Sequence, residues 1–333
     1  MKAIVTGITG QDGYYMAQLL LREGIGVIGL ARDPKSSREQ FPLPQFAGLE
    51  FEKFDYNHPG LFEKVFRKYQ PNFVFNFAAK ATGQGMFDAP SEMIRLNGTF
   101  VLDILEVIRN SPDPERTSFC QASSSEMFGN AQLSPQDESV PFWPKSPYGA
   151  AKLFAHNMVG IYRDVYGLRC CSAILYNHES IRRSAQFVTR KIANGAARIS
   201  LGLQGHLQLG ALDTSRDWGY APEYVRAMYL MAAREQPADY VVATGKLNTI
   251  RRLCEIAFGH VGLKYNDYVR IDAKNARVNP SIGLHGDPSR ILRDLGWRAE
   301  FSIEKIISEM VDYELSILSG SGTEFTFHHM FPN

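Results

Sequence analysis

Two side chains near the middle of the sequence could carry acid-base chemistry. Tyr148 and Lys152 stand four residues apart in Tyr-Gly-Ala-Ala-Lys, so on a helix both project from the same face. We expect the lysine charge to lower the pKa of the tyrosine, so that a phenolate takes a hydroxyl proton while hydride leaves the same carbon. The pattern is common by chance, and a salt-bridged surface helix is the alternative.

A second group precedes this pair in the segment Ser123-Ser124-Ser125-Glu126. A hydroxyl at the carboxyl end of a parallel strand lies where ligands bind in such folds, so we expect Ser124 to share a substrate oxygen with Tyr148. Simple alcohol oxidation needs no carboxylate, whereas abstraction of a proton beside a new ketone does. Glu126 therefore points to proton abstraction, with a helix-capping or structural carboxylate as the alternative.

A glycine-rich turn opens the chain. Gly7, Gly10 and Gly13 lie in TGITGQDG, between a predicted first strand and first helix. Glycines there allow a tight turn and close approach of a pyrophosphate to the N–H groups of the helix. The spacing GxxGxxG alone is a weak signal, but its position favours a dinucleotide site over a plain turn.

The end of the second strand bears on the identity of the dinucleotide. The strand ends in Ala31-Arg32, and Asp33 follows. An acidic residue here binds the ribose 2′-hydroxyl of NAD, whereas arginine favours the 2′-phosphate of NADP. We predict NADP, although Asp33 could turn toward a ribose. Asp55 and Tyr56, after the third strand, are candidates for the adenine pocket.

Strands and helices must alternate to position these residues. Short β-branched runs begin near residues 2, 26, 49, 73, 117 and 168, and helical patterns separate them, the longest at 146–167. This alternation predicts an α/β fold, a doubly wound, Rossmann-like parallel sheet. Beyond Glu179 the rhythm loosens, with isolated strands such as Val241 to Thr244, which suggests a smaller mixed α/β substrate-binding domain.

The domain boundaries follow from the same pattern. We expect residues 1–175 to form mainly the dinucleotide domain, with some later segments returning to it, and residues 176–318 to form mainly the substrate-binding domain. Residues 319–333 mix Gly, Ser, aromatics and His, which predicts a loosely held tail.

Composition excludes several classes of function. The 333 residues carry 36 Lys+Arg and 35 Asp+Glu, a net charge of +1, which argues against a broad basic surface for nucleic acid or an acidic membrane. The sequence has neither a signal peptide pattern nor an apolar run approaching the roughly 18 residues of a spanning helix. The four cysteines form no CxxC pair, so free thiols in a reducing cytoplasm are expected, without a metal site.

These motifs together resemble the GDP-mannose 4,6-dehydratase family, within the extended short-chain dehydrogenases/reductases. The similarity runs from the first strand to about Leu315 and is carried by TGITGQDG, QASSSEMFG, PKSPYGAAKL, LYNHES, FVTRKI, SRDWGYAPEYV, YVVATG and GDPSRILRDLGW. The resemblance implies tightly held NADP that is recycled in each turnover by hydride transfer from C4 to C6 of a sugar nucleotide. Tyr148, Lys152 and Ser124 would act at C4 and Glu126 at C5 and C6, giving a 4-keto-6-deoxy sugar.

The resemblance also implies binding residues. The implied NADP site comprises Gly7, Ile8, Thr9, Gly10, Gln11, Asp12, Gly13, Arg32, Asp55, Tyr56, Phe77, Ala78, Ala79, Lys80, Tyr148, Lys152, His178 and Arg183. The implied substrate site comprises Ser125, Asn177, Lys191, Arg216 and Arg277.

The sequence departs from the family pattern near the expected sugar site. Ser124 replaces a threonine and keeps the hydroxyl. Lys80 begins a segment, Lys-Ala-Thr-Gly-Gln-Gly, that replaces neutral hydrogen-bonding groups, and Glu92 replaces a tyrosine. These changes favour a substrate related to GDP-mannose, such as a GDP-heptose.

Other departures affect nucleotide recognition and assembly. Pro280 stands where the family has a glutamate that accepts from the guanosine ribose, and proline has no side-chain acceptor. Asp33 replaces a second arginine in a loop that reaches a neighbouring subunit in the family, so a homodimer is favoured and a homotetramer is in doubt. Ile181 and Ser184 replace a proline and a glycine.

Two further functional hypotheses stay open. The chain could be an epimerase, reductase or decarboxylase of the same superfamily, from which Glu126 would distinguish a dehydratase. It could instead be a non-catalytic NADP-binding regulator, but a protein that only binds has no use for paired acid-base groups.

Overall fold

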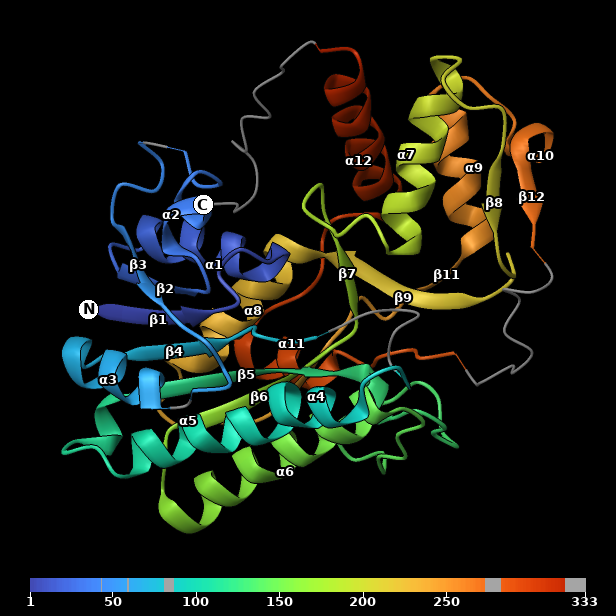
Figure 1. Cartoon of the computed structure of the whole chain (residues 1–333). Helices are drawn as coiled ribbons and strands as arrows, with labels where there is room; N and C mark the ends of the chain where they lie inside the picture. Colours follow the sequence, from blue (N-terminus) through green and yellow to red (C-terminus); the bar gives the residue numbers. More distant parts are fainter. Residues whose placement is uncertain (43, 59, 81–86, 273–282, 321–333) are drawn as a thin grey trace.

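The computed structural model describes residues 1–42, 44–58, 60–80, 87–272 and 283–320 (Figure 1). The first elements along the chain are β1 (Lys2–Thr6), α1 (Gln11–Arg22), β2 (Gly26–Ala31), α2 (Pro34–Arg38), β3 (Leu49–Lys53), α3 (Gly60–Tyr69), β4 (Phe73–Asn76), α4 (Pro90–Ile94), the π-helix η2 (Arg95–Thr99), α5 (Phe100–Arg109), η3 (Pro114–Arg116), β5 (Ser118–Ser124), η4 (Ser125–Met127), α6 (Pro147–Tyr166) and β6 (Cys170–Leu175). The later elements are β7 (Asn177–Glu179), α7 (Val188–Ser200), β8 (Leu207–Leu209), β9 (Ser215–Tyr220), α8 (Ala221–Ala233), β10 (Tyr240–Val242), β11 (Leu247–Thr249), α9 (Ile250–His260), α10 (Tyr265–Tyr268), β12 (Val269–Ile271), α11 (Ser289–Leu295) and α12 (Ile303–Leu318).

The main sheet has seven parallel strands in the order β10-β6-β5-β4-β1-β2-β3. The order reverses between β1 and β4, and ligands bind at such a switch point, outside the carboxyl ends of the strands. The β1–α1 turn and the end of β5 both lie at this edge. The predicted α/β, doubly wound, Rossmann-like fold is confirmed.

Helices cover both faces of the main sheet (Figure 1). One apolar cluster joins α3, α5 and α6 to one face, and a second joins α1 and α8 to the other. Except for β3 at the edge, the strands are almost wholly buried, which explains why most of them carry runs of apolar residues. All four cysteines are free and buried, two of them facing each other across β5 and β6.

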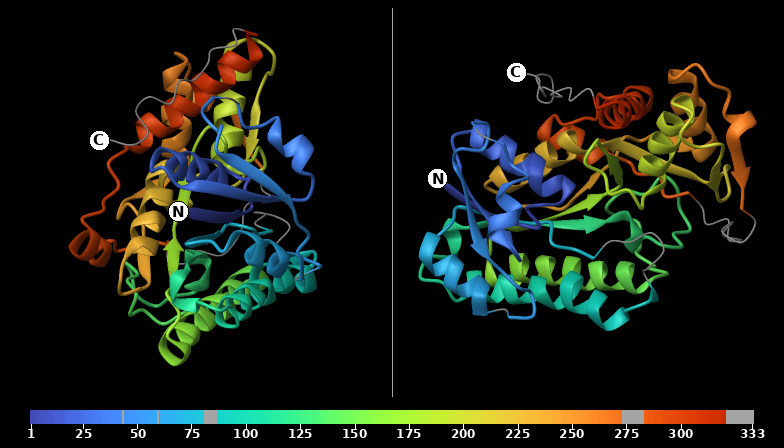
Figure 2. Two further views of the ribbon diagram at one scale, coloured as in Figure 1. Left: turned by 90° about the vertical axis from the view of Figure 1, so that its left-hand side faces the viewer. Right: turned by 45° about the horizontal axis from the view of Figure 1, so that its top comes forward.

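A smaller part lies beyond the carboxyl edge of the main sheet. Helices α7, α9 and α12 pack together there, beside a β11-β9-β7 sheet and a β12-β8 pair (Figures 1 and 2). The strand expected at Val241 to Thr244 is not isolated, because β10 pairs with β6 and extends the main sheet. The division of the chain at residue 175 stays a prediction.

Local signals explain the bounds of α6. Ser146 accepts a hydrogen bond from the Gly149 N–H at 3.0 Å, and Pro147 takes the first helical position, both of which favour a helix start. Gly167 ends the helix with φ of +68°, a conformation that costs glycine little. No helix of the described ranges is long and apolar enough to cross a membrane.

Candidate active site

The carboxyl end of β5 and the start of α6 bring the predicted catalytic residues together. Ser124 ends β5, and Glu126 follows on the short helix η4. A Cβ at Gly149 would lie 2.5 Å from the Glu126 carbonyl oxygen, so only glycine permits this approach of α6 to η4. Tyr148 is thereby held beside Ser124 and Glu126, both of which act on its phenol.

The Tyr148 phenol is buried, and this corrects one expectation. Burial raises its pKa to about 12, although a hydrogen bond with Ser124 opposes that rise. The expected lowering by Lys152 is not found: Ser124 and Arg183 are the groups that lower the pKa of the phenol, and desolvation of the phenolate outweighs them. The Lys152 Nζ lies 5.8 Å from the centre of the Tyr148 ring and donates to the Ala122 carbonyl at 2.7 Å.

The Lys152 ammonium is almost completely buried, with 2% of the residue exposed. Burial lowers its pKa to about 8, against a smaller opposing effect of Asp12. The lysine therefore stays mostly charged near neutrality and becomes neutral in mildly alkaline solution, so a titratable positive charge lies close to the phenol.

This shift predicts a pH-dependent stability. Between about pH 8 and pH 10.5 the unfolded lysine keeps a proton that the folded one has lost, so the free energy of unfolding rises with pH. We expect the wild type to gain about 2 kcal/mol relative to Lys152→Met between pH 7 and about pH 10. Urea denaturation of both proteins across this range measures the gain, and a constant difference would contradict it.

Glu126 has a half-buried side chain whose carboxylate makes no hydrogen bond or ion pair with the described residues. Its backbone N–H donates to Ser124 Oγ at 3.2 Å, so Ser124 caps η4. The side-chain capping bond of η4 is thus made by Ser124, and Glu126 lies in the first turn of that short helix.

The glycine turn fits a dinucleotide. Gly7 has φ of +61°, and a Cβ there would lie 2.8 Å from the backbone of Phe77 and Ala78. A Cβ at Gly13 would lie 2.4 Å from the Gly7 carbonyl oxygen, where α1 starts. Ile8 is buried, whereas Thr9 and Gly10 are exposed at the turn. This side-chain-free cradle before a helix suits a pyrophosphate.

Gln11 and Asp12 join this turn to the smaller part of the molecule. Asp12 accepts from His178 Nε2 at 3.0 Å, and Gln11 Nε2 donates to the His178 carbonyl at 3.1 Å. Burial raises the pKa of Asp12. The positive charge of His178 and its hydrogen bond to Asp12 have a larger effect in the other direction, so the pKa is lowered overall. Burial lowers the pKa of His178, but Asp12 reverses this and raises it. The two residues therefore favour each other's charged forms.

Arg183 lies close to both the catalytic and the glycine-turn residues. Its guanidinium pairs with the buried Glu179 at 3.1 Å and stacks on Phe187 at 3.7 Å. Its charge lowers the pKa of Tyr148 and of Asp12, in each case as a minor effect. The structure thus places this predicted cofactor contact beside the site.

Two of the departures from the family pattern meet in the structure. The Lys80 ammonium pairs with Glu92, which also accepts from the Tyr56 hydroxyl at 2.9 Å. Hydrogen bonding to Glu92 raises the pKa of Lys80. The lysine that was expected to face the sugar therefore has a carboxylate partner, and its charge is balanced within the protein.

The remaining predicted residues are spread around this edge. Asp55 accepts from the Asn57 N–H at 2.9 Å, Ala79 is exposed, and Ser125 is buried in η4. Asn177 in β7 pairs with Trp218 in β9, the strand that carries Arg216, whereas Lys191 is exposed on α7. Arg277, Pro280 and the residues directly after Lys80, 81–86, lie outside the described residues.

One buried residue near the site escapes sequence reasoning. Asn97 lies in the π-helix η2, its Nδ2 is 3.5 Å from the Lys80 carbonyl oxygen, and its Oδ1 has no partner among the described residues. π-Helical turns are frequent at functional sites. No sequence pattern that we used signals such a turn.

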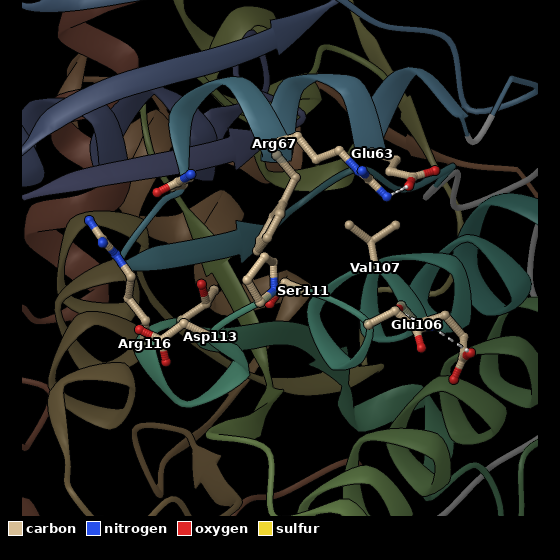
Figure 3. Close-up of a pocket in the computed structure, with 12 residues that line it drawn as sticks. Glu63, Arg67, Glu106, Val107, Ser111, Asp113 and Arg116 are labelled. Carbon is tan, nitrogen blue, oxygen red and sulfur yellow. Dashed lines mark hydrogen bonds and ion pairs between the residues drawn. The ribbon is translucent and has the colours of Figure 1, made fainter.

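A cavity of about 520 Å³ lies away from the candidate site (Figure 3). Phe66, Arg67 and Val107 of α3 and α5 line it, together with Thr117 just before β5. These residues mark the amino ends of β4 and β5, opposite the edge that carries Ser124. The cavity contains none of the predicted site residues.

Comparisons with known proteins decide the family. A sequence model described as GDP-mannose 4,6 dehydratase matches residues 4–310. The chain belongs to this dehydratase family. GDP-mannose 4,6 dehydratase 1 of Arabidopsis thaliana is 39% identical over 325 residues, covering 95% of this chain and 90% of the plant protein. GDP-mannose 4,6-dehydratase of Sinorhizobium fredii is 38% identical, covering 96% and 98%.

Solved structures agree on the architecture of this dehydratase-family chain. The UDP-glucose 4-epimerase of Thermotoga maritima superposes with a TM-score of 0.84 at 21% identity, over 96% of this chain and all of the epimerase. At that identity the likeness shows a shared fold only. Among the described residues, no group of three metal-ligating side chains gathers that could hold an ion.

Proposed function

We propose that the protein is an NADP-dependent 4,6-dehydratase that converts GDP-mannose, or a related GDP-sugar, to its 4-keto-6-deoxy derivative. Family membership supports the reaction class. The observation that carries the proposal is the Glu126 carboxylate, which has no partner among the described residues and lies close enough to influence the Tyr148 phenol. An acid-base residue beside an alcohol-oxidising tyrosine is what elimination from C5 and C6 requires.

The residues of the glycine turn, with Arg32 at the end of β2, would hold NADP. When bound, NADP would supply reversible hydride storage, accepting hydride from C4 of the sugar and returning it to C6, so that no external oxidant is consumed. The Asp12–His178 and Gln11–His178 contacts hold α1 against β7. They would thereby position this site relative to the smaller part of the molecule.

Tyr148 would act first, as the base that takes the proton of the C4 hydroxyl. Ser124 would hold the same oxygen, and the Lys152 ammonium would favour the phenolate. Because the Tyr148 pKa is raised to about 12 by burial, these two groups must supply the bias toward deprotonation. The resulting C4 ketone makes the C5 proton acidic.

Glu126 would then remove the C5 proton and pass a proton to the C6 hydroxyl, which leaves as water. A C5–C6 double bond forms at this stage. After hydride reaches C6, Tyr148 would return its proton to C5, which restores both catalytic groups. The net change is the loss of one water molecule.

A panel of GDP-, CDP-, dTDP- and UDP-sugars, incubated with the protein without added cofactor, tests the proposal. We expect a loss of water, measured by mass, from GDP-sugars only. The panel includes GDP-mannose and a GDP-heptose, because the Lys80–Glu92 pair replaces neutral groups of the family near the expected sugar site. Much faster turnover of GDP-mannose than of every larger GDP-sugar would overturn the expectation that the enzyme prefers a relative of GDP-mannose, such as a GDP-heptose.

We also propose that the enzyme is a cytoplasmic homodimer or homotetramer. Helix α6 exposes Phe154, Ile161 and Val165, spaced to lie on one side of the helix, with 38%, 44% and 70% of each residue exposed. Covering this apolar face in an assembly would remove it from water. Light scattering of the purified protein measures the subunit number.

A further inference from the structure

Strands β2 and β3 end side by side. They are parallel, Ala31 is paired with Lys53, and the Phe54 N–H donates to the Ala31 carbonyl at 2.8 Å. Arg32 and Lys53 therefore stand next to each other at the carboxyl edge of the sheet. Both side chains are exposed, and neither forms an ion pair with a described residue.

Strand alternation decides the face on which Lys53 lies. Its neighbour Glu52 accepts from Lys68 at 2.6 Å and from Tyr69 at 2.8 Å, both on α3. Successive side chains of a strand point to opposite faces. Lys53 therefore shares a face with Phe51, whose ring packs against Phe41 directly after the α2 segment. Ala31, which pairs with Lys53, is buried in the same apolar cluster as Phe41, so Lys53 lies on the face that carries α2.

Asp33, the acidic residue directly after Arg32, forms hydrogen bonds with backbone N–H groups. Its Oδ1 accepts from the N–H groups of Lys35 at 3.1 Å and Ser36 at 3.4 Å, as the N-cap of α2. Hydrogen bonds from Ser36, with a smaller effect of the Lys53 charge, lower its pKa. Lys53 thus reaches the neighbourhood of this loop, and the Asp33 carboxylate is held at the start of α2 by these bonds.

We propose that Lys53 is the second cation that, with Arg32, binds the 2′-phosphate of NADP and sets the preference for NADP over NAD. The inference rests on the cofactor named in the proposed function. Lys53 supplies a second positive charge from the adjacent strand, and a phosphate monoester with nearly two negative charges at neutral pH accommodates both cations.

Fluorescence titration of nucleotide-free protein with NADPH and with NADH tests the inference without relying on turnover. We expect Lys53→Met to weaken NADPH binding about tenfold and to leave NADH binding unchanged, because only the phosphate contact is lost. Lys53→Arg should keep the NADPH preference. Lys64→Met, which removes an exposed lysine from α3 on the opposite face, is the matched control.

The outcomes separate this inference from the proposed reaction. Equal weakening of NADPH and NADH, or no change in either, would overturn the role of Lys53, as would failure of the wild type to bind NADPH. A selective loss of NADPH affinity supports it. If that selective loss occurs in a protein that dehydrates none of the sugar nucleotides, the proposed reaction fails and the Lys53 assignment stands.

Discussion

Replacement of Tyr148 by phenylalanine is expected to lower kcat for water loss from the GDP-sugar by about 10³-fold. In the proposed mechanism the phenol takes the C4 hydroxyl proton, and phenylalanine keeps the ring while removing the acid-base function. The same variant should also fail to oxidise C4. Steady-state kinetics and the absorbance of reduced nicotinamide measure the two effects.

The control is Tyr166→Phe, at the other end of the same helix, where the ring is half exposed. It should keep wild-type kcat, because Tyr166 lies far along α6 from Ser124 and Glu126. Tyr148→Phe activity within about tenfold of the wild type would show that another group deprotonates C4.

Replacement of Glu126 by glutamine is expected to have a similarly large effect on dehydration, about 10³-fold, but to spare the first step. Glutamine keeps the size of the side chain and cannot take the C5 proton. Tyr148, Ser124 and Lys152 remain, so C4 oxidation should continue. Reduced nicotinamide should accumulate on the variant when substrate is added, while the mass of the sugar shows no loss of water.

The control for Glu126→Gln is Glu115→Gln, which makes the same change at an exposed carboxylate on η3. Full dehydratase activity in Glu126→Gln would remove C5 proton abstraction from the mechanism. An epimerase or reductase of the same superfamily would then become the better hypothesis.

Much of the fold follows from the sequence because each strand and helix carries its own signal. Most of the strand runs are buried, and Ser146 and Gly167 mark both ends of α6. β10 was harder to place, because three residues carry too little pattern to show that they return to the main sheet.

The proximity of the proposed catalytic residues was predictable because their spacing is local. Tyr148 and Lys152 need only one helical turn, and Ser124 and Glu126 flank the end of one strand. The pKa of Tyr148 was not predictable, because it depends on burial by elements distant in sequence.

Pairings between distant residues needed the structure. Lys80 and Glu92 each departed from the family pattern, but their ion pair joins segments whose relation no periodicity reveals. Asp33 could be read as a ribose ligand until its bonds to the start of α2 were seen. The position of Lys53 beside Arg32 was not predictable from the sequence, because it follows from strand register.

GDP-mannose carrying deuterium at C4 tests internal hydride transfer most directly. Incubated with the purified protein without added cofactor, it should give a product that has lost one water and carries deuterium at C6, as seen by mass spectrometry and NMR. The label moves because hydride removed at C4 is returned within the same turnover. A dehydrated product without deuterium at C6, or a product that keeps both its water and its C4 label, would contradict the proposed dehydratase.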